Sequence, residues 1–227
     1  SYSSDLGPIG YTVNAHRRPI SSSLLAFGGQ KDTNTGTTWG GVRATGGGVS
    51  ISYDKGEANG VWSSLNAETL TGKNVEDNWR VRWMTGYYYK LINKNNERLT
   101  VGVSNMLWHY DKDLSGYTLG QGGYYSPQEY VSFALPVTWR KRTENWSWEL
   151  GGSVSWSHSK TKDELRYPIQ NLIPTDEPDR YTDRGAMETG SSSSGTGYTA
   201  RAIIERRVTS NWFVGMGVDI QEAKDYT

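Results

Sequence analysis

The sequence predicts an all-β protein, an antiparallel up-and-down transmembrane β-barrel that is present in part. Apolar and polar residues alternate with period two in about nine segments, a pattern typical of strands whose two faces meet different surroundings. The connections between these segments alternate between short and long. The chain has 10 tryptophans and 15 tyrosines but only 3 phenylalanines, and rings with a polar edge suit a boundary between oil and water.

Composition limits the alternatives. Lysine plus arginine (24) equals aspartate plus glutamate (24), so the net charge gives no reason to expect nucleic acid as a partner. The mean hydropathy is −0.69 and no run of 18 apolar residues occurs, which excludes a transmembrane helix but is compatible with strands whose lumen face is polar. The absence of cysteine excludes disulfides and thiolate sites. No signal peptide precedes Ser1 and the chain stops just after a strand pattern, so we expect a piece of a longer protein.

The clearest strand covers residues 79–91. Its odd positions are apolar or aromatic, from Trp79 to Leu91, and its even positions are mixed and cationic, including Arg80 and Lys90. Strands in soluble sheets commonly contain about five or six residues, whereas a tilted strand needs roughly nine to eleven to cross a bilayer. The length of this alternation favours a membrane-spanning strand.

The same criterion predicts eight further strands. They cover residues 9–16, a segment that ends at Tyr53, and residues 61–67, 99–108, 130–140, 146–157, 198–205 and 212–221. The triplet Gly46-Gly47-Gly48 predicts a bulge or bend; no helix start or Lys-Ser/Thr follows it, as a phosphate-binding loop would require. Pro136 predicts a local bulge, because proline cannot donate to the ladder. We predict no helix.

The predicted connections alternate in length. They cover residues 17–41, 54–60, 71–78, 93–96, 110–123, 141–145, 159–197 and 209–211. An up-and-down barrel with short periplasmic turns and long outer loops produces this alternation, whereas a Greek-key sandwich has no reason to keep it.

The tryptophans fall near the strand ends. Five are expected at the periplasmic ends (Trp62, Trp139, Trp146, Trp148, Trp212) and five toward the outer ends (Trp39, Trp79, Trp83, Trp108, Trp156). Two such groups predict aromatic girdles at the two membrane interfaces. The alternative is that these rings are core aromatics of a soluble β protein.

The opposite phase of the strands is polar and predicts a lumen lining. Its candidate residues are Arg80, Arg82, Tyr88, Trp108, Tyr130, Glu149, Arg201 and Asp219. Mixed charge with scattered rings would let a neutral, hydroxyl-rich polymer slide, because conduction needs many weak contacts and no tight one. The alternative is that these side chains only hydrate and brace the wall.

No metal, cofactor or catalytic site is predicted. By phase, His16 points inward while His109 and His158 point outward, so the three histidines do not converge on a metal. His109 with Asp111 and a serine would be the starting point for a hydrolase, but no nucleophile motif accompanies them. We therefore expect no enzyme.

Long runs of the chain resemble the C-terminal domain of the cellulose synthase operon protein C family. These runs are GYTVNAHRRPI (10–20), GTTWGGVRATGGGVSISYDKGEANGVWSSL (36–65), RWMTGYYYK (82–90), WHYDKDLSGYTLGQGGYYSPQ (108–128) and ERRVTSNWFVG (205–215). The resemblance implies a porin in the outer membrane of a Gram-negative bacterium that exports β-1,4-glucan, with no cofactor or catalytic residues. It also implies a sixteen-stranded barrel that contacts outer-membrane lipid. A periplasmic tetratricopeptide region would precede it, and an inner-membrane cellulose synthase complex would supply the glucan.

The chain departs from that family in two respects. It contains no helical repeats, and it lacks the final strand of the family domain; residues 1–227 would then be part of one barrel domain. Nine strands is an odd number, whereas bacterial single-chain barrels close with an even one, so this piece should not close alone. A general or solute-specific porin and a soluble carbohydrate-binding β-sandwich stay open as alternatives.

Overall fold

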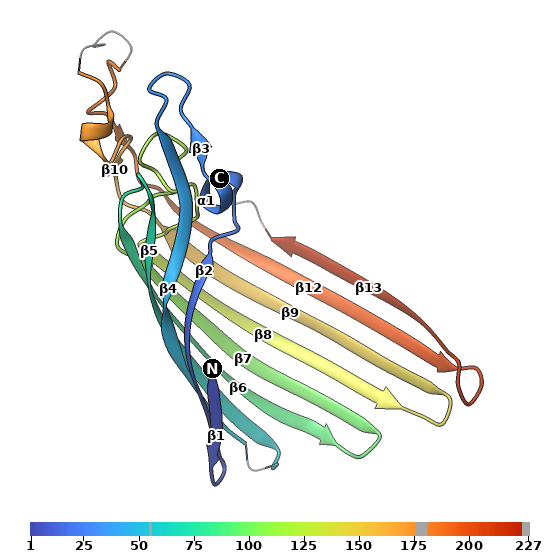
Figure 1. The fold of residues 1–227 in the computed structure, drawn as a ribbon. Helices are drawn as coiled ribbons and strands as arrows, with labels where there is room; N and C mark the ends of the chain where they lie inside the picture. The colour runs from blue at the N-terminus through green and yellow to red at the C-terminus, as the bar shows by residue number, and fades with distance from the viewer. Residues whose placement is uncertain (55, 176–180, 224–227) are drawn as a thin grey trace.

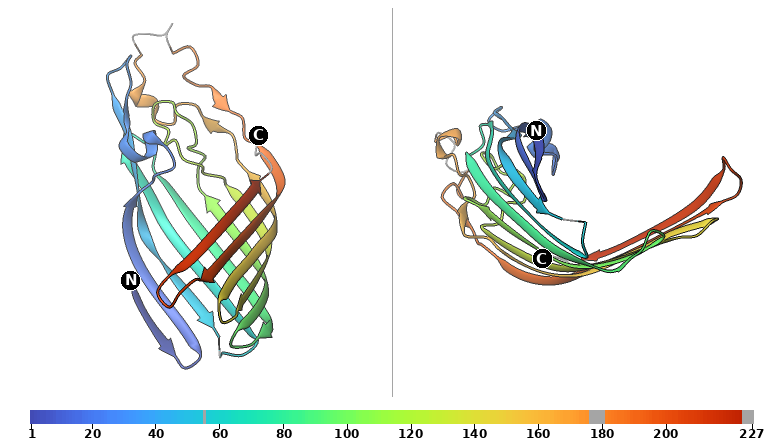
Figure 2. Two further views of the ribbon diagram at one scale, coloured as in Figure 1. Left: turned by 90° about the vertical axis from the view of Figure 1, so that its right-hand side faces the viewer. Right: turned by 90° about the horizontal axis from the view of Figure 1, so that it is seen from below.

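The computed structural model describes residues 1–54, 56–175 and 181–223. Its main feature is one curved antiparallel sheet in which ten strands follow one another in the order β1-β2-β4-β5-β6-β7-β8-β9-β12-β13. Figure 1 shows the strands side by side in chain order, and Figure 2 shows the sheet curved into a trough. Since each strand pairs with its neighbours in sequence, the topology is up-and-down, and the sheet is a portion of a barrel wall.

The bounds of the ten strands are β1 (Tyr2–Leu6), β2 (Ile9–Pro19), β4 (Thr38–Tyr53), β5 (Asn59–Lys73), β6 (Asn78–Asn93), β7 (Glu97–Tyr110), β8 (Glu129–Arg142), β9 (Trp146–Lys160), β12 (Ser192–Arg207) and β13 (Phe213–Ala223). All but β1 contain 11 to 16 residues, at least the roughly nine to eleven that a tilted strand needs to cross a bilayer. Within the described residues, no helix is long and apolar enough to span a membrane.

The nine predicted strands are present, but the prediction missed β1. Tyr2–Leu6 lacks an alternating pattern and pairs with β2 through a hairpin in which Leu6 lies opposite Ile9. The prediction also ended several strands too early. The predicted connection 159–197 is wrong for Ser192–Ser194, because these residues begin β12 and pair with β9, with Ser194 opposite His158. Tertiary pairing overrides the low strand propensity of serine.

The two longest predicted loops contain short elements. The segment between β2 and β4 holds α1 (Leu24–Gly28) and β3 (Gln30–Lys31), so the prediction of no helix was wrong. Ser23 caps α1 by accepting a hydrogen bond from Ala26 N at 3.0 Å. Between β9 and β12 lie β10 (Glu164–Leu165), η1 (Gln170–Leu172) and β11 (Met187–Glu188), and β10 pairs with β11.

Both predicted bulges are wrong. The pairing of β4 with β5 is continuous from Arg43 to Tyr53, and its register shift lies between Gly40 and Arg43 instead. Gly46 is needed for close approach, since a Cβ there would lie 2.1 Å from the carbonyl oxygen of Ala67. Pro136 lies opposite Ser153 with no register shift on either side of β8.

A small apolar core covers one end of one face of the sheet. It is the end that carries the longer connections (Figure 1). The core joins α1, the ends of β4, β5 and β7, part of the connection between β9 and β12, and the inner segment, which we define as residues 111–128. Its buried residues are Leu25, Ala26, Trp39, Val42, Leu70, Val75, Tyr110, Leu114, Leu119, Tyr124 and Ile173. We call the face that these segments cover the concave face, because they lie inside the trough (Figure 2).

Candidate functional site

All eight predicted lumen residues lie on the concave face. Cross-strand partners share a face, and one register row joins Arg82, Trp108 and Tyr130 across β6, β7 and β8. Tyr88 and Arg80 share the phase of Arg82 on β6. On the later strands Glu149, Arg201 and Asp219 take the same face, with Arg201 directly opposite Asp219. The alternation along each strand is therefore sufficient to sort the side chains between the two faces.

Glu68 is the centre of a charged network on this face that the sequence analysis missed. Its side chain is fully buried and lies within 4 Å of four basic side chains. Arg80 Nε donates to Glu68 Oε2 at 2.6 Å and Arg82 Nη2 donates to the same oxygen at 3.0 Å. His16 Nε2 lies 2.7 Å and Arg18 Nη2 3.5 Å from Oε1. One carboxylate thus holds side chains from β2, β5 and β6 together.

The register explains how these side chains meet. One row runs from His16 through Gly46, Glu68 and Arg80 to Tyr110. Gly46 has no side chain, so the His16 ring can reach across β4 to the carboxylate. At the other end, Arg80 Nη1 donates to the Tyr110 hydroxyl at 2.9 Å. Arg80 is only 8% exposed, so it braces the wall and is not open to a passing molecule.

The aromatic pair Trp108 and Tyr130 forms the next row. Their ring centroids lie 5.0 Å apart on neighbouring strands, beside Arg82. Trp108 also packs against the apolar core, whereas Tyr130 begins the less covered part of the wall. The two rings are tilted by 32° to each other. Such rings present an apolar surface with a polar edge, which suits the face of a sugar ring.

A polar pocket opens on the concave face near the short turns. It is lined by Asp54, Tyr88, Lys90, Arg98, Thr100, Thr138 and Arg140. The Tyr88 hydroxyl donates to the Asp54 carboxylate, and Lys90 Nζ lies 5.6 Å from the centroid of the Tyr88 ring. The hydrogen bond from Tyr88 holds the pKa of Asp54 below its ordinary value. The Tyr88 ring, flanked by the charged groups of Asp54 and Lys90, therefore lines this pocket near the short turns.

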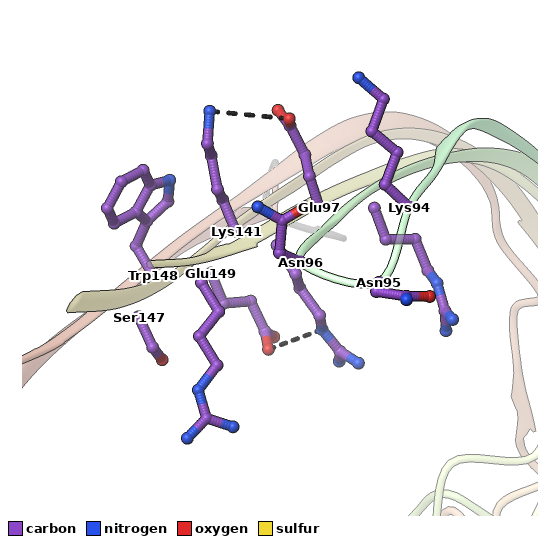
Figure 3. A pocket seen from close by; sticks show the side chains of 11 residues that line it. Lys94, Asn95, Asn96, Glu97, Lys141, Ser147, Trp148 and Glu149 are labelled. Carbon is purple, nitrogen blue, oxygen red and sulfur yellow. Dashed lines mark ion pairs between the residues drawn. The ribbon is translucent and has the colours of Figure 1, made fainter. Parts of the chain in front are cut away.

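A neighbouring pocket lies at the turns themselves (Figure 3). Arg140 pairs with Glu149 at 2.8 Å and Lys141 pairs with Glu97 at 3.6 Å. Arg140 lies on the concave face and its side chain is 61% exposed. Glu149 therefore meets solvent and an exposed cation, unlike the buried Glu68.

The inner segment packs against the concave face at the end of the sheet that carries the longer connections. Asn78, at the start of β6, anchors it: its side chain donates to Lys112 O at 2.9 Å and accepts from Lys112 N at 3.0 Å. Its amide nitrogen also donates to the Tyr124 hydroxyl at 3.2 Å, and burial raises the pKa of Tyr124. Lys112 Nζ donates to Glu76 at 2.5 Å, which raises the pKa of Lys112. Buried irregular backbone persists where such partners satisfy it.

The tryptophans divide between the two faces. Six lie on the convex face: Trp79, Trp83, Trp139, Trp146, Trp148 and Trp156. Trp212 precedes β13 in the turn after β12 and is 72% exposed. Trp79 and Trp83 are each 42% exposed there. Trp39, Trp62 and Trp108 lie on the concave face, so these three rings are not part of a girdle on the convex face. The expected division of five and five concerns the two ends of the strands and stays a prediction. Trp39 is in the core because the bulge before Arg43 reverses the phase of β4, and Trp62 packs over Gly86.

The histidines occupy the predicted faces. His16 contacts Glu68 on the concave face. On the convex face, the ring centroids of His109 and Trp79 lie 5.1 Å apart, and the His158 ring stacks on Trp156. Among the residues that the structure describes, no group of three or more histidine or acidic side chains could hold a metal ion.

A long-stranded up-and-down sheet with an apolar convex face and a polar, partly plugged concave face defines the wall of a barrel-type protein. The chain belongs to the family described as the cellulose synthase operon protein C C-terminus, whose family model matches residues 1–227. Cellulose synthase operon protein C of Salmonella typhimurium strain LT2 is 75% identical over 100% of this chain and 19% of its own length. The protein of that name from Escherichia coli K12 is 74% identical over 100% of this chain and 20% of its own length.

More distant relatives carry the same name. The protein from Pseudomonas fluorescens strain SBW25 is 33% identical over 95% of this chain and 16% of its own length. The chain spans about a fifth of the length of the first two relatives.

Proposed function

We propose that this chain forms part of an outer-membrane channel that exports β-1,4-glucan from the periplasm to the surface of a Gram-negative bacterium. The division of the sheet into two faces carries the proposal. Exposed aliphatic side chains such as Val49, Leu65 and Leu135 would meet lipid on the convex face, with its six tryptophans and Trp212 toward the edges. The polar and aromatic residues of the concave face would line the passage.

The proposed mechanism is passive guidance. The inner-membrane cellulose synthase complex would supply the chain, and a periplasmic tetratricopeptide region of the parent protein would lead it to the short-turn mouth. Tyr88 at that mouth and Tyr130 farther along would each stack weakly on sugar rings. Exposed polar groups such as Arg201 and Asp219 would replace water around the hydroxyls. No step requires catalysis or a cofactor, because many weak contacts suffice for movement.

The structure bears differently on the two alternatives, a soluble carbohydrate-binding β-sandwich and a general or solute-specific porin. A β-sandwich requires two packed sheets, whereas the main strands here form a single sheet, so that alternative is wrong as a fold. A general or solute-specific porin has the same wall and stays open. Family membership favours the glucan, since the relatives are named for the cellulose synthase operon.

The two adjacent tyrosines Tyr87 and Tyr88 provide the test. Tyr88 lies on the concave face, whereas Tyr87 is 44% exposed on the convex face. In the full-length parent, Tyr88→Ala should lower cellulose secretion by about 2- to 10-fold through loss of one stacking contact. Tyr87→Ala is the matched control and should secrete normally. Dye binding by colonies measures secretion, and heat-dependent gel mobility of the barrel measures folding.

Channel recordings separate the glucan exporter from the general porin. In planar bilayers, cello-oligosaccharides should block the conductance of the full-length parent more strongly than malto-oligosaccharides of equal length. Tyr88→Ala should weaken that block. Equal block by both sugars, together with normal secretion by Tyr88→Ala, would favour the general porin.

A further inference from the structure

Three basic residues cluster on the convex face at the end of the sheet that carries the longer connections. Arg17 lies on β2, Arg43 on β4 and Lys73 at the end of β5, and all three are exposed. Arg17 lies opposite Thr45, two residues from Arg43; Arg43 lies opposite Thr71, two residues from Lys73. Such diagonal neighbours on one face are about 7–8 Å apart. We call these three residues the cation cluster.

The cation cluster has no acidic counterpart. Within the described part of the chain, every ion pair involves other residues, including the four basic side chains around Glu68. By contrast, the convex-face cation at the corresponding end of β9, Lys160, lies opposite Glu129. Three neighbouring positive charges without an acid repel one another and attract anions.

The surface below the cluster changes character in steps. Exposed threonines lie beside the cations, namely Thr45, Thr69 and Thr71. Farther along the same strands the convex face becomes aliphatic and exposed, with Val13, Val49 and Leu65 in one register row. Charge, hydroxyls and aliphatic side chains follow one another along β4 and β5, whereas β2 passes from Arg17 through Ala15 to Val13. This sequence matches a molecule with phosphates on a hydroxylated headgroup above acyl chains.

Lys73 also borders a groove that adds a fourth cation. The lining residues of this groove are Gly28, Gly29, Gln30, Lys31, Thr38, Trp39, Gly40, Gly41 and Lys73. Glycines leave backbone groups accessible to a ligand, and two lysines at one groove favour a doubly charged anion. The groove extends the positive surface beyond the strand ends.

We propose that the cation cluster binds a phosphorylated glycolipid of the outer leaflet, with its phosphates on Arg17, Arg43 and Lys73 and its acyl chains along the aliphatic residues of β2, β4 and β5. The inference rests on the proposed placement of the convex face against the outer membrane. It assigns that face a specific lipid at one place on its circumference, where the channel wall is also braced from inside by the Glu68 network.

The test compares two variants of the full-length parent in detergent. One carries Arg17→Gln, Arg43→Gln and Lys73→Gln, and the control carries Lys160→Gln. The probes are diphosphorylated lipid A and the same lipid after enzymatic removal of both phosphates, with binding followed by native mass spectrometry. The triple variant should bind diphosphorylated lipid A about 100-fold more weakly than the unchanged protein. The Lys160→Gln control should bind it as the unchanged protein does.

Three results would overturn the proposal. Equal affinity of the unchanged protein for the two lipids is the first, and it needs no variant to fold. Unaltered binding by a folded triple variant is the second. Displacement of lipid A by an equimolar amount of inorganic phosphate is the third, because the site would then serve free phosphate. Heat-dependent gel mobility after reconstitution reports membrane insertion separately, so failure of the proposed function is distinguishable from failure of lipid binding.

Discussion

The two halves of the concave face treat polar side chains differently. In the half formed by β2 to β7, Glu68, Arg80 and Asn78 are buried and bonded within the protein. In the half formed by β8 to β13, Arg140 and Arg201 are exposed and Ser153 bonds Thr199 in an exposed pair at 2.8 Å. The first half also carries α1 and the inner segment (Figure 1).

This difference shows that polar side chains on the concave face can have two roles. Around Glu68, one carboxylate is shared by three arginines and His16, and these contacts inside the protein hold strands together. Across β8 to β13, polar groups keep contact with solvent and can exchange water for sugar hydroxyls under the proposed function. We therefore expect changes in the Glu68 network to affect stability, and changes at the exposed polar groups of β8 to β13 to affect transport.

The largest effect should come from Glu68→Gln. Removing one partner of a buried ion pair leaves uncompensated arginines, which costs about 3–5 kcal/mol of folding free energy. The matched change Glu149→Gln removes a carboxylate whose partner Arg140 is 61% exposed, and such pairs contribute about 0–1 kcal/mol. Urea unfolding of the reconstituted full-length parent, followed by tryptophan fluorescence, gives both values. Equal destabilisation by the two variants would contradict the distinction between the halves.

A second variant should loosen the inner segment without unfolding the wall. Asn78→Ala removes the side-chain hydrogen bonds to Lys112 and Tyr124, at a cost of about 1–3 kcal/mol for the groups left unsatisfied. Hydrogen exchange should then increase in residues 111–128 and stay unchanged in β8 and β9.

The control for this variant is Asn105→Ala on the convex face. The Asn105 side-chain oxygen is buried and has no hydrogen-bond partner in the described part of the chain. If both variants expose residues 111–128 equally, Asn78 is not the anchor of the inner segment.

The sequence was sufficient to predict the features that depend on the alternation of apolar and polar residues along a strand. It identified nine strands and the face on which Trp79, Tyr88 or Arg201 lies, because period two ties each side chain to a face. It could not find the Glu68 network, since contact between His16 and Glu68 depends on the registers of β2, β4 and β5 and on the missing side chain of Gly46.

The elements that lack alternation, such as the inner segment and α1, were also not predicted from the sequence. The inner segment has no period and is held by distant partners such as Asn78. Trp39 lies on the concave face because of a bulge between Gly40 and Arg43. Gly40 and Gly41, both with positive φ, form this bulge, but the sequence analysis placed them in a loop. One signal was overlooked: Ser23 followed by Leu24 and Leu25 fits a helix N-cap and would have indicated α1.

The smallest expected effect on stability concerns the short turn after β4, where Asp54 accepts a hydrogen bond from Tyr88. Because this bond lowers the pKa of Asp54 in the folded protein, the carboxylate contributes stability above its ordinary pKa of 3.8. That contribution is lost as the pH falls through the lowered pKa. Asp54→Asn should therefore melt slightly below the unchanged protein at pH 7, and the gap should close under strongly acidic conditions. Tyr88→Phe should remove the same contribution, so the double variant should melt no lower than the less stable single variant. Additive losses would show that the bond does not link β4 to β6.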